Sequence, residues 1–134
     1  MENQHIVQHA RLAQTKALCS YSQFPVGACV LSDHDNLSTG FNIESASYGL
    51  TMCAERVALY NALSKGYRNH TYMALVTNTG SFPCGACRQV LYEYCPNLTI
   101  IIATPTEIIT TSTIEALMPH GFGNKDVTTL TKGL

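Results

Sequence analysis

Two stretches of this sequence decide its fold and chemistry: Cys53-Ala54-Glu55 and Pro83-Cys84-Gly85-Ala86-Cys87. In the second stretch, a helix that begins at Pro83 places the sulfurs of Cys84 and Cys87 on one face of its first turn. In the first stretch, Cys53 and Glu55 can both reach an object that lies just beyond the N-terminus of a helix that begins there. The pattern predicts three thiolates around one carboxylate that is not itself a ligand.

Three protein ligands with an open fourth position are typical of a catalytic zinc site. Zinc lowers the pKa of bound water from about 15.7 toward about 7, so hydroxide becomes available at neutral pH. Helix N-termini that point at the metal favour anions and therefore help to keep the cysteines ionised. We expect Cys53, Cys84 and Cys87 to bind one Zn²⁺ per subunit and Glu55 to move protons.

Arg56 follows Glu55 directly and is the candidate that offsets the charge of this site. Three thiolates on one zinc ion leave a formal charge of about −1, which weakens the metal as a Lewis acid. A donor that hydrogen-bonds the ligand sulfurs withdraws part of that charge. The alternative is that Arg56 is an ordinary surface arginine.

The chain resembles the small, homotetrameric cytidine deaminases over roughly Tyr21 to Phe122. Besides the cysteine stretches, the resemblance rests on Tyr21-Ser22-Gln23-Phe24-Pro25-Val26-Gly27-Ala28, Phe41-Asn42-Ile43-Glu44, Ala46-Ser47-Tyr48, Cys87-Arg88-Gln89-Val90 and Pro119-His120-Gly121-Phe122. Zinc deaminases use His/Cys/Cys or Cys₃ ligands and a glutamate that is not a ligand, and Cys53 selects the Cys₃ variant. The resemblance implies an α/β fold, a three-layer α/β/α sandwich with a central mixed five-stranded sheet.

The resemblance also implies roles for residues that spacing alone does not assign. Phe24 would stack on the pyrimidine ring, and the backbone at Ala54 would meet the edge of the base. Asn42 and Glu44 would hydrogen-bond a ribose hydroxyl. Without the resemblance, Phe24 reads as a core residue, and Asn42 and Glu44 read as a solvated loop after a strand.

Two further residues would complete the pocket of a neighbouring subunit in a homotetramer, namely Tyr48 and Phe122. The alternative for both is packing within one chain. The sequence departs from the family pattern at Ser20, where many members have proline, and at Phe82, where a small residue is usual. The tail after Phe122 also matches poorly, so these differences concern the rim of the pocket and the C-terminal contacts.

Composition limits the remaining possibilities. The 134 residues predict one catalytic domain, 1–134, and the net charge of −1 comes from eight basic and nine acidic residues without a basic stripe. We therefore expect no nucleic-acid partner. No apolar run approaches the roughly 18 residues of a membrane span, and the first residues lack a leader pattern, so we expect a cytoplasmic protein without membrane contact.

Hydrophobic periodicity and turn signals predict strands that alternate with helices. An opening helix carries Ile6, Ala10, Ala13 and Ala17 and ends near Cys19-Ser20-Tyr21. A second helix follows an N-cap at Thr51, and a short last helix follows a capping box of Ser112 and Glu115 and ends near Pro119. The other expected elements are strands at 26–31, 38–43, 72–77, 98–103 and 107–111, a turn at 32–36 and a helix from 84 to about 94.

The remaining cysteines and the five histidines fit no metal-ligand spacing. Cys19, Cys29 and Cys95 are expected to be small buried hydrophobic residues. Isolated histidines are more often surface or structural residues than catalytic ones, and none is assigned a role.

We interpret the sequence as a hydrolytic deaminase that converts cytidine and 2′-deoxycytidine to uridine and 2′-deoxyuridine plus ammonia, in pyrimidine salvage. The same motif serves polynucleotide editors and deaminases of other amino-heterocycles, such as blasticidin-type nucleoside antibiotics. A dithiol redox protein that uses Cys84 and Cys87 is an alternative from another class, but it leaves Cys53 unexplained. A structural zinc module would need a fourth protein ligand, for which no residue stands at a suggestive spacing.

Overall fold

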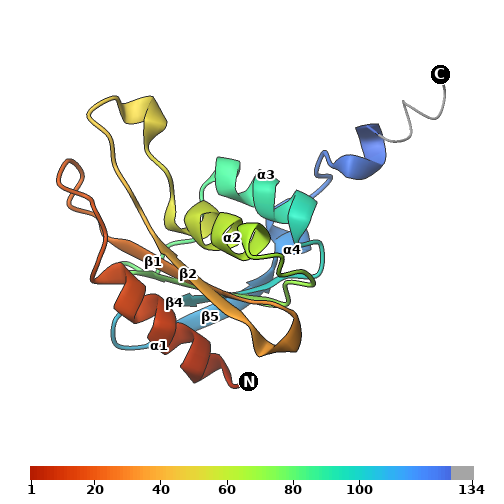
Figure 1. The fold of residues 1–134 in the computed structure, drawn as a ribbon, viewed down its shortest axis with the longest axis horizontal. Helices are drawn as coiled ribbons and strands as arrows, with labels where there is room; N and C mark the ends of the chain where they lie inside the picture. The colour runs from red at the N-terminus through yellow and green to blue at the C-terminus, as the bar shows by residue number, and fades with distance from the viewer. Residues whose placement is uncertain (128–134) are drawn as a thin grey trace.

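A mixed sheet forms the centre of the computed structural model, which describes residues 1–127 (Figure 1). Its five strands lie in the order β2-β1-β3-β4-β5. Their bounds are β1 Val26–Leu31, β2 Leu37–Phe41, β3 Tyr72–Thr77, β4 Thr99–Ala103 and β5 Ile108–Thr113. Only β3 and β4 are parallel to each other, and the other neighbouring pairs are antiparallel.

Helices cover both faces of the sheet. Helix α1 (Asn3–Gln14) lies on one face, and α2 (Ala54–Ser64), α3 (Gly85–Tyr94) and α4 (Ile114–Leu117) lie on the other (Figure 1). Short 3₁₀ turns occur at Asp33–Asp35 and Tyr48–Leu50. The predicted three-layer sandwich with a mixed five-stranded sheet is therefore confirmed.

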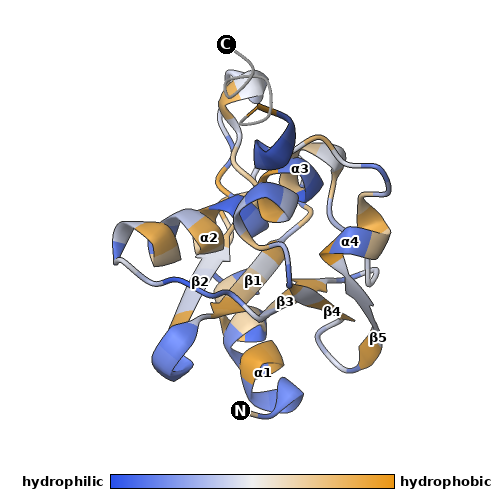
Figure 2. Ribbon diagram, turned by 90° about the vertical axis from the view of Figure 1, so that its right-hand side faces the viewer, coloured by the Kyte–Doolittle hydropathy of each residue, from blue (hydrophilic) through white to orange (hydrophobic). Residues whose placement is uncertain are grey.

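Two apolar clusters hold the layers together. On the α1 side, Ile6, Val7 and Ala10 pack against alternate residues of β1, β3 and β4. On the α2 side, a larger cluster joins α2, α3 and α4 to the opposite face of the same strands. Figure 2 shows the corresponding orange colour along the central strands, and helices in which orange and blue segments alternate. Burial on both faces explains why β3 and β4 read as near-continuous apolar runs.

Strand register gathers three chain segments at one end of the sheet. Val26, which begins β1, pairs with Thr77, which ends β3, and Gly27 pairs with Phe41, which ends β2. The segment before β1 and the segments after β2 and β3 therefore leave the sheet at the same end. Residues 24, 42 and 78–84 lie on these three segments, so the register brings them to a common region.

Glycine at position 40 allows α2 to approach the sheet closely. A Cβ atom at Gly40 would lie 2.4 Å from the backbone nitrogen of Ala58 and 2.6 Å from the carbonyl oxygen of Ala54. Both contacts are shorter than nonbonded atoms tolerate, so only glycine fits. The contact fixes the N-terminal turn of α2 against β2.

The first helix ends earlier than the sequence predicts, at Gln14 instead of near Cys19. The backbone nitrogen of Leu18 donates to Asn42 at 2.9 Å, and the nitrogen of Glu44 donates to Leu18 at 2.9 Å. This pairing with a distant segment requires an extended chain at residue 18 and therefore stops the helix.

Two predicted helix caps are also wrong. Thr51 does not cap α2: its neighbour Met52 exchanges backbone hydrogen bonds with Ile43, and the cap position falls at Cys53. At α4 the cap is Thr113 instead of Ser112, because the Thr113 hydroxyl accepts a hydrogen bond from the backbone nitrogen of Ala116 at 3.2 Å. The helix ends at Leu117.

Within residues 1–127, none of the helices combines the length and the apolar character that a membrane crossing demands.

Candidate active site

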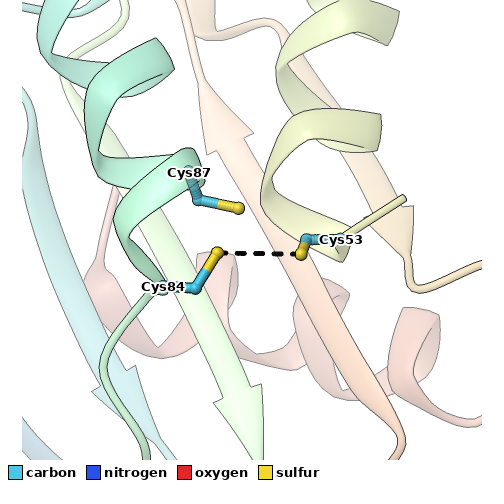
Figure 3. Close-up of side chains that lie close together, drawn as sticks. All are labelled: Cys53, Cys84 and Cys87. Carbon is cyan, nitrogen blue, oxygen red and sulfur yellow. Dashed lines mark hydrogen bonds between the residues drawn. The ribbon is translucent and has the colours of Figure 1, made fainter. Parts of the chain in front are cut away.

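Three cysteine sulfurs meet where the N-termini of α2 and α3 face each other (Figure 3). Cys53 occupies the N-cap of α2, Cys84 occupies the N-cap of α3, and Cys87 lies in the first turn of α3. All three sulfur atoms lie within 4.8 Å of one another, and those of Cys53 and Cys84 are 3.9 Å apart. The N-terminal ends of α2 and α3 thus bring the three thiols together, as the sequence spacing predicts.

The cluster fits a zinc ion. Ligand sulfurs at about 2.3 Å from a tetrahedral metal are about 3.8 Å from one another, close to the distance between Cys53 and Cys84. Thiolates are soft ligands that zinc accepts well. Within the described residues the cluster contains three ligand side chains, so a tetrahedral metal keeps one open position. A structural site would have that position closed by the protein.

Arg56 lies against the cluster. Its Nη2 atom donates to the sulfur of Cys53 at 3.4 Å, and its Nε atom is buried without a hydrogen-bond partner in the described chain. The adjacent Cys87 thiol and then Arg56 lower the pKa of Cys53 to about 5, against the opposing effect of burial. The hydrogen bond to Cys53 and burial both raise the pKa of Cys87. Of Cys53 and Cys87, Cys53 is therefore the thiol that ionises more readily.

Glu55 lies in the first turn of α2 with only 5% of its surface exposed. Its side chain faces the cavity beside the sulfurs but is not part of the cluster of potential ligands. Burial, as the largest cause, raises the pKa of Glu55 to about 7. A carboxyl group near neutrality can both accept and donate a proton, as general acid–base chemistry requires.

A cavity of about 280 Å³ opens beside the cysteines. It is large enough for a small planar ligand and brings together residues from all three segments at this end of the sheet. Six of the predicted site residues line it: Phe24, Asn42, Glu44, Cys53, Glu55 and Cys84. The structure therefore assembles residues whose proximity the resemblance implied but the spacing could not show.

Asn42 holds the backbone on either side of Pro25. Its Oδ1 atom accepts a hydrogen bond from the backbone nitrogen of Val26 at 3.0 Å, and its Nδ2 atom donates to the carbonyl of Phe24 at 2.9 Å. The side chain is buried, with 7% of the residue exposed. Asn42 thus fixes the position of Phe24 in addition to lining the cavity.

Glu44 holds the preceding turn in the same way. Its Oε1 atom accepts from the backbone nitrogens of Tyr21 and Ser22 at 3.0 and 3.1 Å, and its Oε2 atom accepts from the Ser22 hydroxyl. These bonds, with the Ser22 hydroxyl as the largest cause, lower the pKa of Glu44. The Ser22 hydroxyl in turn accepts from the backbone nitrogen of Phe24 at 3.0 Å.

The remaining predicted site residues lie outside the cavity. Ala54 is fully buried at the start of α2, between Cys53 and Glu55. Tyr48 is 74% exposed and packs its ring edge-on against Tyr21, with 5.9 Å between centroids. Phe122 is 57% exposed. An exposed aromatic ring is available to a partner, but neither ring contributes to the cavity of its own chain.

Sequence reasoning gave no role to several residues near the site, among them Ser22 and Arg88, whereas it expected Phe82 at the rim of the pocket. Ser22 and Phe82 line the cavity, and Arg88 donates to the backbone of Pro83 beside Cys84. Ser22 and Arg88 belong to the segments that carry the resemblance, and Phe82 is a departure from it, but none has a spacing signal that indicates its contacts. Of the remaining cysteines, Cys29 and Cys95 are buried as expected, whereas Cys19 is partly exposed.

Comparison with known proteins agrees with the geometry. Residues 1–103 match the family described as "Cytidine and deoxycytidylate deaminase zinc-binding region". The cytidine deaminase of Halalkalibacterium halodurans is 41% identical over 130 residues, which is 95% of this chain and 98% of that protein. A blasticidin-S deaminase from Bacillus cereus is 28% identical over 104 residues, which is 70% of this chain and 74% of that protein.

The fold comparison gives the same result. The crystal structure of cytidine deaminase from Burkholderia pseudomallei superposes with a TM-score of 0.87 at 37% sequence identity, covering 91% of this chain and 100% of that one. The mixed sheet, the paired helix N-termini and the three-sulfur cluster are those of a zinc-binding deaminase domain. Within that class, this chain belongs to the cytidine and deoxycytidylate deaminase family.

Proposed function

We propose that this protein is a zinc-dependent enzyme that hydrolyses cytidine and 2′-deoxycytidine to uridine, 2′-deoxyuridine and ammonia, and so serves pyrimidine salvage. The observation that carries the proposal is the buried carboxylate of Glu55 beside a three-sulfur cluster in the wall of a cavity of nucleobase size. Residues 1–134 act as one catalytic domain in this proposal.

In the proposed mechanism, Cys53, Cys84 and Cys87 hold the zinc ion. Zinc supplies a Lewis acid that activates water at neutral pH. Glu55 takes a proton from the water that attacks C4 of the pyrimidine and delivers it to N3. It then takes the proton of the new hydroxyl on C4 and delivers it to the departing amine, which leaves as ammonia while C4 becomes a carbonyl. Its burial and raised pKa support both roles. Arg56 offsets the charge of the sulfurs through its bond to Cys53.

The substrate contacts that we propose come from the resemblance, and the lining of the cavity by Phe24, Asn42 and Glu44 supports three of them. Phe24 stacks on the pyrimidine, and the backbone at Ala54 meets the edge of the base. Asn42 and Glu44 hydrogen-bond the ribose while they hold the turn that carries Phe24. A sugar-recognising pair separates a nucleoside deaminase from a deaminase of free bases.

We also propose that the active unit is a cytoplasmic homotetramer whose partner is the nucleoside, without nucleic acid or membrane. Tyr48 and Phe122 contact a neighbouring subunit in this proposal, which their exposure supports. Six free cysteines suit a reducing compartment. The absence of a basic stripe in the sequence argues against a polynucleotide substrate.

A deaminase of blasticidin-type antibiotics is the second candidate, because one such enzyme from Bacillus cereus is among the relatives. The redox alternative is weaker, because a dithiol needs two sulfurs and this cluster has a third. The decisive experiment is an ultraviolet assay of the purified protein on cytidine, deoxycytidine, adenosine and blasticidin S, with metal analysis of the same sample. We expect about one zinc per chain and turnover of the two cytosine nucleosides. Turnover of blasticidin S alone, or a metal-free protein with redox-active thiols, would replace the proposal with the corresponding alternative.

A further inference from the structure

Cys84 stands at the end of the loop that connects β3 to α3. The chain leaves β3 at Thr77 and has no regular secondary structure from 78 to 84. The Thr77 hydroxyl holds the start of this loop by accepting from the backbone nitrogen of Ser81 at 2.8 Å. Cys84 itself is exposed, and its thiol makes no capping hydrogen bond to α3. Something else must fix the end of the loop that carries the sulfur.

Arg88 makes that contact. Its Nε atom donates to the carbonyl of Pro83 at 2.8 Å, and its backbone nitrogen donates to the carbonyl of Cys84 at 3.0 Å. Both peptide groups that flank the Cα atom of Cys84 are therefore held by one residue. No other donor in the described part of the chain reaches the Pro83 carbonyl, and Pro83 is buried. An unpaired buried carbonyl is costly, so loss of Arg88 would leave this segment strained or displaced.

The same guanidinium extends to a second element. Its Nη1 atom donates to the carbonyl of Leu117 at 3.1 Å, at the C-terminal end of α4. That carbonyl is one of those that a helix end leaves without an intrahelical partner. A planar guanidinium presents donors in a fixed fork, whereas a lysine ammonium is a point charge on a flexible stem. Arg88 thus connects the cysteine loop to α4, which packs on α3 and β5.

We propose that Arg88 is a positioning residue of the zinc site, which holds the Pro83–Cys84 segment against α4 and so places the Cys84 sulfur for metal binding. The inference rests on the proposed function only in taking Cys84 as a zinc ligand. Residues that orient ligands typically change metal affinity by about 10- to 100-fold when they are removed. The effect of Arg88 comes from geometry, because the bonds go to backbone carbonyls and none goes to a sulfur.

Gln89 offers a matched control. Its Nε2 atom donates to the carbonyl of Phe122 at 2.7 Å, so this neighbour in α3 also ties the helix to the C-terminal part of the chain. No hydrogen bond joins its side chain to the Pro83–Cys84 segment in residues 1–127. Gln89→Ala therefore loosens the C-terminal segment without releasing the cysteine loop.

The test compares Arg88→Gln, Arg88→Lys and Gln89→Ala with the parent protein. Zinc affinity is measured by competition with a chromophoric chelator, and the ligand geometry is read from the visible absorption of the Co²⁺-substituted proteins. We expect both Arg88 variants to bind zinc about 10- to 100-fold more weakly and to change the Co²⁺ bands, while Gln89→Ala retains the parental values. Far-ultraviolet circular dichroism of each metal-free protein checks the fold, and if Arg88→Gln does not fold, Arg88→Lys provides the comparison.

The outcomes separate the two proposals. A parent protein that binds no zinc would contradict the proposed function and not the hydrogen bonds of Arg88. A zinc-binding parent with unchanged affinity and spectra in the Arg88 variants would overturn the positioning role. Full rescue by Arg88→Lys would also overturn it, because it would show that charge and not the fork geometry is required. An equal loss in Gln89→Ala would assign the effect to the C-terminal segment as a whole.

Discussion

The guanidinium of Arg56 donates from Nη2 to the sulfur of Cys53 at 3.4 Å, within the same helical turn. The contact pairs a cation with a thiol that ionises readily, since the pKa of Cys53 is lowered to about 5 by Cys87 and then by Arg56. A hydrogen bond to a ligand sulfur withdraws electron density from that ligand. Arg56 is therefore placed to strengthen the metal as a Lewis acid.

Arg56→Gln is expected to lower kcat by about 10- to 100-fold and to change KM less, because charge withdrawal matters most when the water is activated. Steady-state kinetics and zinc content measure the effect. Arg68→Gln is the control, since Arg68 is exposed and bonds to the backbone carbonyls of Leu63 and Tyr67. Parental kcat, KM and zinc content in Arg56→Gln would show that the contact has no role in catalysis.

Glu55→Ala is expected to retain zinc and lose about 10²- to 10⁴-fold in kcat, because the carboxylate moves protons in the proposed mechanism and is not among the clustered ligands. Cys84→Ala is expected to lose the metal. Zinc analysis and a cytidine assay on both variants separate the two roles, with Glu93→Ala, an exposed residue of α3, as the control. A Glu55→Ala protein that arrives without zinc, or that keeps near-parental turnover, would refute the assignment.

The ribose role predicts that cytosine, the free base, is a very poor substrate. Glu44→Ala should raise KM for cytidine strongly, because it removes both the sugar contact and the anchor of the turn before Phe24. Ser22→Ala should have a smaller effect, since Glu44 keeps the backbone donors of Tyr21 and Ser22. Equal losses in the two variants would indicate that Glu44 only holds the turn. Good turnover of cytosine would remove the sugar contact from the mechanism.

Phe122→Ala is expected to weaken substrate binding and oligomer formation together. Burial of an aromatic ring against a partner contributes about 1.5–3 kcal/mol, and a closed tetramer repeats the contact at every site. Light scattering and specific activity across a dilution series measure both effects. Leu12→Ala, which truncates an exposed side chain on the opposite face of the sheet, is the control. A fully active monomer would assign Phe122 to packing within its own chain.

The environment of His70 leads us to expect that the stability of the fold depends on pH, independently of catalysis. Its Nδ1 atom lies 2.7 Å from the buried Ser32 hydroxyl, and burial followed by Arg68 lowers its pKa below 6.5, against an opposing effect of Asp33. The unfolded chain therefore binds a proton more readily than the folded one. Stability is fully present above the unfolded pKa and falls as the pH drops through that value.

Urea unfolding of His70→Asn and the parent measures this effect. Between about pH 7.5 and pH 5.5, the free energy of unfolding should fall less in the variant than in the parent. The zinc ligands are the same in both proteins, so their contribution cancels when the changes in unfolding free energy between the two pH values are compared. His34→Asn, which removes an exposed imidazole, should behave like the parent. Identical pH differences in the parent and His70→Asn would contradict the prediction.

Local sequence signals predicted most of the strands and helices. They failed where pairing between segments that are distant in the sequence sets the end of a helix. The strands at 26–31 and 72–77 have the predicted bounds, because each is an apolar run bordered by turn residues. The end of α1 was misplaced because Leu18 pairs with the segment around Asn42 and Glu44. The Thr51 cap was misplaced for the same reason, since pairing with Ile43 keeps the chain extended up to Cys53.

The residues of the candidate site also fall into two groups: those that helical spacing brings together, and those whose partners are distant in the sequence. The convergence of Cys84 and Cys87 follows from helical spacing, and the addition of Cys53 follows from two facing helix ends. The bonds of Asn42 and Glu44 could not be predicted, because their partners are backbone groups of a turn about twenty residues away. Arg88 gave no signal for the same reason, since its acceptors are the carbonyls of Pro83 and Leu117.

The position of the cysteine cluster depends on the absence of a side chain at Gly40, on the side of α2 that faces β2. The helix touches β2 through backbone atoms at Ala54 and Ala58, with no side chain between them that could adjust. A methyl group at this position would lift the N-terminal turn and carry Cys53 away from Cys84. The floor of the pocket is therefore rigidly tied to the sheet. Changes of substrate range are better sought at its rim, where Ser22 and Phe82 line the cavity without belonging to the cysteine cluster.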